Sequence, residues 1–186
     1  MSDQSIILVS CGLFEKKLTE RVAENVTREL HFPVELIECS LDISDFYNPV
    51  RRQYDADELL RMITERAPAD DVRGIGMARV DLYIPILTYI FGQAHLNGRT
   101  GVVSIFRLRN EHYGLKPDYE LLIERFTKVI IHELVHTFGL IHCSHPACVM
   151  RSSTYVEDLE QKEYRFCMVC REEFNRAAAL SRSQIR

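Results

Sequence analysis

The segment KVIIHELVHTFGLIH, residues 128–142, restricts the fold of this chain more than any other part of it. Its first half is apolar on nearly every side of a helix, so this helix must be buried. His132 and His136 are four residues apart and therefore share one helix face, where both imidazoles can reach a single metal ion. The chain must bury this helix and still keep two histidines at a metal site.

The residues that follow complete the pattern of a catalytic metal site. Gly139 suits the left-handed backbone that ends a helix, and His142 can then return as a third nitrogen ligand. Three neutral histidines leave one tetrahedral position of zinc open, and such a zinc lowers the pKa of a bound water to about 7. Glu133 lies within reach of that water. HExxH alone also occurs by chance on amphipathic helices, and the added glycine and histidine favour the metal site.

Four cysteines form a second pattern directly after the histidines. Cys143 and Cys148 make one pair, and Cys167 and Cys170 make another with CxxC spacing. Two such pairs are typical of a closed zinc site, which stabilises a fold and leaves no position for chemistry. A redox or disulfide role is the alternative, but a redox CxxC normally opens a helix near the start of a thioredoxin-like unit. His145 is close enough in sequence to be a substitute ligand.

Together, HExxHxxGxxHC, a further cysteine, C-x-M and a downstream CxxC resemble the archaemetzincin family of zinc peptidases. The motifs cover residues 132–170, and the resemblance implies a metzincin core over most of the chain. It implies that the three histidines bind the catalytic zinc, that Glu133 is the general base, and that the four cysteines hold a second zinc. It also implies that Met150 is the Met-turn residue beneath the metal, although a methionine by itself is more often a core residue.

One position departs from other metzincins. Astacin-like and serralysin-like members carry a tyrosine two residues after the methionine, where it can ligate zinc or stabilise the oxyanion. Ser152 occupies that position here. Tyr155 comes later and could reach the site, but a surface or core position is the favoured interpretation, so the sequence assigns no oxyanion partner.

Composition limits the class of protein. The 186 residues are 46% hydrophobic and 27% charged, as expected of one soluble globular domain. A net charge of −4 without a basic run gives no case for nucleic-acid binding. No segment approaches the roughly 20 apolar residues of a membrane span, and the N-terminus does not resemble a secretory signal. We therefore expect a cytoplasmic monomer whose cysteines are reduced and free to bind metal.

The order of predicted elements indicates an α/β (α+β), metzincin-like fold. Strands are predicted at residues 6–9, 34–39, 72–83, 89–96 and 100–108, and helices at residues 15–30, 55–67, 118–138 and 168–180. Asn97-Gly98 is a strong hairpin signal and predicts a mixed twisted sheet with an antiparallel edge strand. Residues 40–54 and 140–167 are predicted loops.

We expect a single catalytic domain over residues 1–186. Residues 1–139 would form an N-terminal α/β subdomain that contains the active-site helix. Residues 140–186 would form a small C-terminal subdomain, stapled by zinc, that contains the Met-turn. The catalytic metal would lie in the cleft between them.

Gly92 and Ala94 are candidate substrate-binding residues in the first strand of the hairpin. Small residues in an edge strand permit close approach of another backbone, here an extended peptide. A weakened strand or a bulge is the alternative. The function predicted from all these features is zinc-dependent peptide hydrolysis with two Zn²⁺ ions per chain. A zinc-containing peptide-binding or partner-docking protein and a small-amide hydrolase remain alternatives.

Overall fold

The computed structural model describes residues 5–67 and 72–183. The helices are α1 (Lys16–Leu30), α2 (Ala56–Arg66), α3 (Tyr119–Thr137), α4 (Val156–Glu160) and α5 (Met168–Ser183). The strands are β1 (Ile6–Cys11), β2 (Val34–Cys39), β3 (Tyr47–Asn48), β4 (Gln53–Asp55), β5 (Arg73–Ala78), β6 (Leu82–Ile84), β7 (Leu87–Ile90), β8 (Gly92–Ala94) and β9 (Thr100–Ser104).

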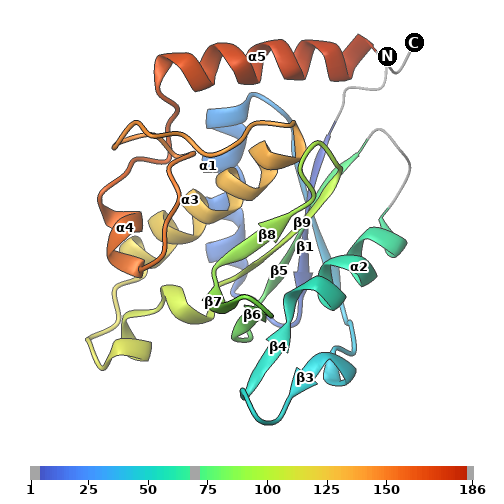
Figure 1. The fold of residues 1–186 in the computed structure, drawn as a ribbon, viewed down its shortest axis with the longest axis vertical. Coiled ribbons are helices and arrows are strands. Elements are labelled where there is room, and N and C mark those ends of the chain that lie inside the picture. Colours follow the sequence, from blue (N-terminus) through green and yellow to red (C-terminus); the bar gives the residue numbers. More distant parts are fainter. Residues whose placement is uncertain (1–4, 68–71, 184–186) are drawn as a thin grey trace.

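The main sheet has the strand order β2-β1-β5-β9-β8. Every neighbouring pair is parallel except β8 and β9, which are antiparallel across the predicted hairpin. The predicted mixed sheet with an antiparallel edge strand is therefore confirmed. Helices α1 and α3 lie on one side of this sheet and α2 on the other, while α5 runs across one end of the molecule (Figure 1).

Two apolar cores follow from this layering. The larger one packs α1 and α3 against the sheet and also takes in Val149, Met150 and Phe174 from the C-terminal part of the chain. The smaller one lies under α2. Apolar residues at every fourth position of α1, namely Leu18, Val22 and Val26, are buried as their spacing predicts. The buried helix α3 is thus held by both the sheet and the C-terminal segment.

Several segments differ from the sequence-based predictions. Residues 40–54, predicted as loop, contain the short strands β3 and β4, which join β6 and β7 in a second sheet. The predicted strand 72–83 is divided between the two sheets as β5 and β6, and 89–96 is divided as β7 and β8. Residues 106–108, predicted as strand, form a 3-10 turn, and α4 interrupts the predicted loop 140–167. The alternation of side chains in the sequence indicated extended backbone, but it did not indicate where the chain passes from one sheet to the other.

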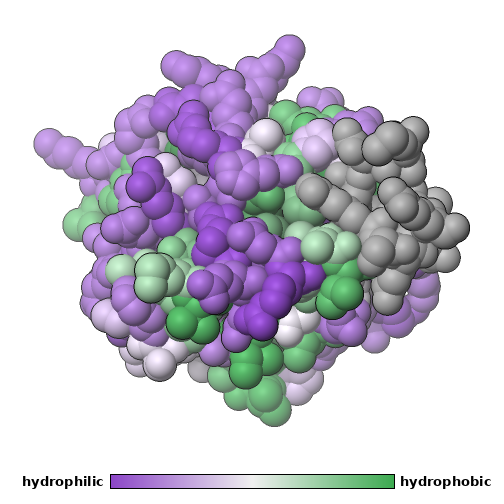
Figure 2. Space-filling view, turned by 90° about the horizontal axis from the view of Figure 1, so that it is seen from above, coloured by the Kyte–Doolittle hydropathy of each residue, from purple (hydrophilic) through white to green (hydrophobic). Residues whose placement is uncertain are grey.

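The surface seen from the α5 side is predominantly hydrophilic, and its apolar residues form small separate groups among the described residues (Figure 2). None of the described helices is both long enough and apolar enough to cross a bilayer.

Candidate metal centre and active-site cavity

Helix α3 positions the first histidines because its sequence fixes both of its ends. Asp118 is the N-cap, and its carboxylate accepts a hydrogen bond from Leu121 N at 3.0 Å. The helix stops at Thr137, and Gly139 takes the left-handed conformation at φ +94°. A Cβ on Gly139 would also lie 3.3 Å from Asn97 Oδ1. The predicted turn after the helix is therefore present, and it redirects the chain toward His142.

The three histidines converge as the motif predicts. Nitrogen atoms of His132, His136 and His142 lie within 4.8 Å of one another. The Nε2 atoms of His132 and His136 are 3.1 Å apart. Two nitrogens bound tetrahedrally at a Zn–N distance of 2.0–2.1 Å would be about 3.4 Å apart. This donor set therefore fits zinc.

Backbone carbonyls select the tautomer of two of these rings. His132 Nδ1 lies 2.9 Å from Val149 O, and His136 Nδ1 lies 2.7 Å from Leu140 O. A carbonyl oxygen only accepts, so each Nδ1 carries the proton and each Nε2 presents a lone pair. Burial lowers the pKa of all three histidines, which favours the neutral form that binds a metal.

Glu133 is buried beside the histidines and lies next to the edge strand. Burial raises the pKa of its carboxyl to about 8, and the positive charge of Lys162 opposes that rise. A Cβ on Gly92 would lie only 2.8 Å from Glu133 Cγ and 2.9 Å from Val102 O. The missing side chain at Gly92 therefore makes room for Glu133.

Replacing Gly92 by alanine is expected to displace Glu133 and to lower kcat more than it changes KM. The new methyl group meets a side chain and a backbone oxygen, and the backbone oxygen cannot move aside easily. A misplacement of about 1 Å in an active site costs on the order of 10²-fold in rate.

Gly74→Ala is the matched control for this prediction, because a Cβ there would meet only Ile7 O at 3.9 Å. Steady-state kinetics and metal content of both variants are the measurements. Equal kcat values for the two variants would contradict the assigned role of Gly92.

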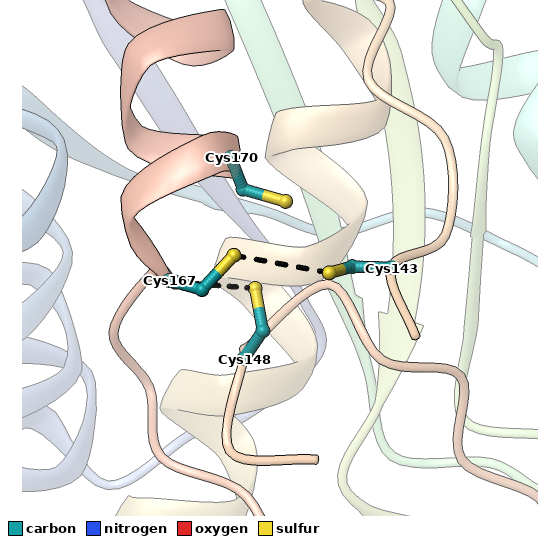
Figure 3. A group of neighbouring side chains, drawn as sticks. All are labelled: Cys143, Cys148, Cys167 and Cys170. Carbon is teal, nitrogen blue, oxygen red and sulfur yellow. Dashed lines mark hydrogen bonds between the residues drawn. The ribbon is translucent and has the colours of Figure 1, made fainter. Parts of the chain in front are cut away.

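The four cysteines form a second cluster with all sulfur atoms within 4.8 Å of one another. Cys170 lies in the first turn of α5 and Cys167 directly precedes that helix, while Cys143 and Cys148 come from the segment after α3 (Figure 3). The sulfur atoms of Cys143 and Cys167 are 3.8 Å apart. Two thiolates bound tetrahedrally at a Zn–S distance of 2.3 Å would also be about 3.8 Å apart. All six cysteines of the chain are free, and this donor set fits a closed zinc site.

Met150 links the two clusters. Its side chain is fully buried, and its carbonyl accepts a hydrogen bond from Cys143 N at 2.9 Å. The carbonyl of the preceding Val149 is the acceptor for His132 Nδ1. The segment around Met150 therefore touches both the histidine site and the cysteine site.

A cavity of ≈ 340 Å³ opens beside the histidines. One wall is the continuous extended chain from Leu87 to Gly92, which joins the edges of the two sheets. The opposite wall is the segment from Ser152 to Tyr155. Tyr89 Oη donates a hydrogen bond of 2.9 Å to Thr154 O and so connects the two walls.

The remaining residues considered in the sequence analysis do not all lie at the cavity or at the cysteine cluster. Gly92 lies in the cavity wall, whereas Ala94 is not among the residues that line the cavity. Tyr155 lines the cavity with 62% of its surface exposed. His145 is not part of the cysteine cluster, and its Nδ1 accepts a hydrogen bond from Ala147 N.

Sequence reasoning missed Lys162, which lines the cavity and is buried. Burial lowers the pKa of its ammonium to about 8, while the Glu133 carboxylate raises it. One sequence signal was available: Val156, Leu159 and Lys162 recur at intervals of three, as residues on one buried face do.

The comparisons with known proteins agree with this geometry. Residues 14–176 match Peptidase family M54. An archaemetzincin of Saccharolobus islandicus is 34% identical over 173 residues, which are 91% of this chain and 92% of that protein. The crystal structure of archaemetzincin from Methanopyrus kandleri has a TM-score of 0.83 and 35% identity, covering 96% of this chain and 97% of that one.

A further solved structure is described as a zinc-dependent peptidase from Methanocorpusculum labreanum. It matches with a TM-score of 0.81 and 31% identity, over 92% of this chain and the whole of that one. The family match covers most of the sequence, and the fold, the histidine cluster and the cysteine cluster accompany it. This chain therefore belongs to peptidase family M54, the archaemetzincins, and is a zinc metallopeptidase.

Proposed function

We propose that the chain hydrolyses peptide bonds with His132, His136 and His142 as ligands of a catalytic zinc and Glu133 as general base. The observation that carries this proposal is the cluster of three histidines beside a cavity that is lined by His132, His142 and Glu133. When bound, the zinc supplies a Lewis acid that polarises a carbonyl group and acidifies a water. Glu133 takes the proton of the attacking water and delivers it to the leaving amine.

The surrounding residues orient this machinery. Val149 O and Leu140 O hold two of the histidine rings, and Met150 forms an apolar floor packed against α3. We further propose that Cys143, Cys148, Cys167 and Cys170 hold a second, structural zinc, so that each chain binds two. This second site supports the first, because Cys143 follows His142 directly.

We also propose that the peptide substrate adds to the open edge of β8 as an extra strand. Ser104 N donates to Phe91 O, and His95 N donates to Thr100 O. In an antiparallel ladder the residues between such pairs direct their N–H and C=O groups to the other side. Gly92 and Ala94 are those residues, so their backbone groups face the open edge. An extended peptide would bind there through main-chain hydrogen bonds.

Replacing Ala94 by proline tests this edge. Proline removes the outward N–H without removing a donor of the β8–β9 ladder. Since one hydrogen bond contributes roughly 0.5–1.5 kcal/mol, we expect KM to rise about 2- to 10-fold with both metals still bound. Ala94→Ser, which retains the N–H, is the control. Normal KM values for Ala94→Pro would place the substrate elsewhere.

We propose further that the chain acts as a cytoplasmic monomer and as a single catalytic domain, with residues 1–139 and 140–186 as its two subdomains. The four clustered cysteines support a reducing compartment, because thiols must stay reduced to hold a zinc ion. The larger apolar core includes Leu8 from the first subdomain and Phe174 from the second, which supports a single domain. Sedimentation of the purified protein tests the monomer.

The decisive experiment for the reaction is cleavage of a peptide library with and without zinc. We expect zinc-dependent cleavage that a chelator abolishes and added zinc restores. A protein that binds peptides without cutting them, or that cuts only small amides, would overturn the proposal.

A further inference from the structure

Lys162 is a cation buried in the wall of the active-site cavity, where the Glu133 carboxylate acts on it without forming an ion pair. Its side chain is only 3% exposed, and it lines the cavity together with Val129 and Leu159. Two other buried cations are paired: Lys128 with Glu124 and Arg125 with Glu160. Among the described residues, no carboxylate forms an ion pair with Lys162. Because burying an unpaired charge is costly, the anion is expected to come from outside the chain.

The hydrogen bonds of Lys162 leave one donor unused. Its Nζ donates to Val149 O at 2.9 Å and to Arg151 O at 2.5 Å. An ammonium group has three N–H donors, so one remains for a ligand. Both acceptors are backbone carbonyls on either side of Met150, and they fix the ammonium in place.

A second unused donor lies in the same wall. Ser153 lines the cavity, and its Oγ is buried with no hydrogen-bond partner in the described part of the chain. A buried hydroxyl without a partner is costly unless a ligand supplies one. Lys162 and Ser153 therefore both belong to the lining of the same cavity, and each has a donor that no described residue accepts.

The rest of the cavity favours a ligand with an apolar stem and a negative end. Val129 and Leu159 are apolar, and Glu133 is the one carboxylate among the described lining residues. Since Glu133 belongs to the hydrolytic machinery, the cavity has no carboxylate to spare for Lys162. A carboxylate on a short aliphatic chain matches this arrangement.

Resting on the proposed peptide hydrolysis, we propose that this cavity is a specificity subsite for a substrate carboxylate. Lys162 and Ser153 would bind the side chain of an Asp or Glu residue next to the cleaved bond. Hydrogen bonds between ionised partners are worth roughly 10- to 100-fold in binding. The enzyme would therefore prefer acidic residues at one position beside the bond that it cuts.

The first test uses the wild-type protein and paired peptides that differ only by Glu against Gln, or Asp against Asn, at each position around the cleaved bond. We expect at least a tenfold preference in kcat/KM for the acid at one adjacent position. Peptides with amidated C-termini show the side-chain effect alone. A free C-terminus with Gln shows whether the terminal carboxylate can substitute. No discrimination at any position, or discrimination only by the free C-terminus, would overturn the proposed side-chain subsite.

The second test removes the charge. Lys162→Met should abolish the preference, whereas Lys162→Arg should retain most of it. The matched control is Lys128→Met, which removes another buried lysine that does not line the cavity and should leave the preference intact. Ser153→Ala should reduce the preference partially, and it is the variant to test if Lys162→Met does not fold. A full preference in Lys162→Met and Ser153→Ala would contradict the assignment.

An affinity measurement tests this subsite independently of the proposed reaction. Calorimetry with the Glu133→Gln variant, which should keep both metals, measures affinity for the same Glu and Gln peptides without hydrolysis. A Glu preference in this binding, together with no cleavage by the wild-type protein, would refute the reaction and keep the subsite. Zinc-dependent cleavage with equal affinity for both peptides would refute the subsite and keep the reaction.

Discussion

Replacing Glu133 by glutamine is expected to lower the rate of peptide hydrolysis by about 10²- to 10⁴-fold, the range that general acid–base catalysis contributes. The amide has the same shape as the carboxylate but cannot take a proton from water. Glu133 lies beside the histidines without being one of the three clustered ligands, so both metals should remain bound. Turnover and metal content of the purified variant are the measurements.

Glu120→Gln is a suitable control for this experiment. Glu120 lies on the same helix in an exposed ion pair with Arg21, and such a pair contributes little to stability. Its replacement should leave turnover unchanged. If Glu133→Gln lost the catalytic zinc, or kept near wild-type turnover, Glu133 would not be the base.

Replacing Cys170 by serine is expected to remove one of two bound zinc ions and to destabilise the C-terminal part of the chain. Structural zinc sites contribute apparent binding free energies of about 10–16 kcal/mol to small domains, which is as large as the stability of a whole domain. The effect should reach the histidine site, because Cys143 N donates a hydrogen bond to Met150 O and the neighbouring Val149 O contacts His132. Metal analysis, thermal unfolding and proteolysis of residues 140–186 measure it.

Cys39→Ser is the control, since Cys39 lies at the end of β2, away from the cluster, and is only half-buried. It should keep both metals and nearly full stability. Wild-type protein that holds one zinc or none after saturation with metal would contradict the two-zinc proposal. Four cysteines paired as disulfides in that protein would favour the redox alternative.

Local motifs allowed the histidine and cysteine clusters to be predicted from sequence. The spacing of His132 and His136 fixes their relation through the helix period, and Gly139 fixes the turn that brings His142 back. The cysteine pairs are close together in sequence as well. Within the histidine motif and within each cysteine pair, a few intervening residues limit the distance between donor atoms, so the sequence carried that information. The contact between the two cysteine pairs joins positions 24 residues apart and depends on the fold.

The second sheet could not be predicted in the same way. The chain from residue 87 to residue 94 reads as one extended segment, yet β7 pairs with β6 and β8 pairs with β9. Alternation of side chains reveals that a strand exists but not which strand is its neighbour. The pairing depends on residues far apart in sequence.

The sequence by itself therefore determined the family, the histidine and cysteine sets that form clusters, and the existence of most helices and strands, because these depend on local spacing. Only the tertiary structure decided what surrounds the histidine cluster. It brings Gly92 against Glu133, connects Tyr89 to Thr154 across the cavity, and buries Lys162 against the carbonyls on either side of Met150. These contacts join distant segments, and the packing of the whole core decides which of them meet.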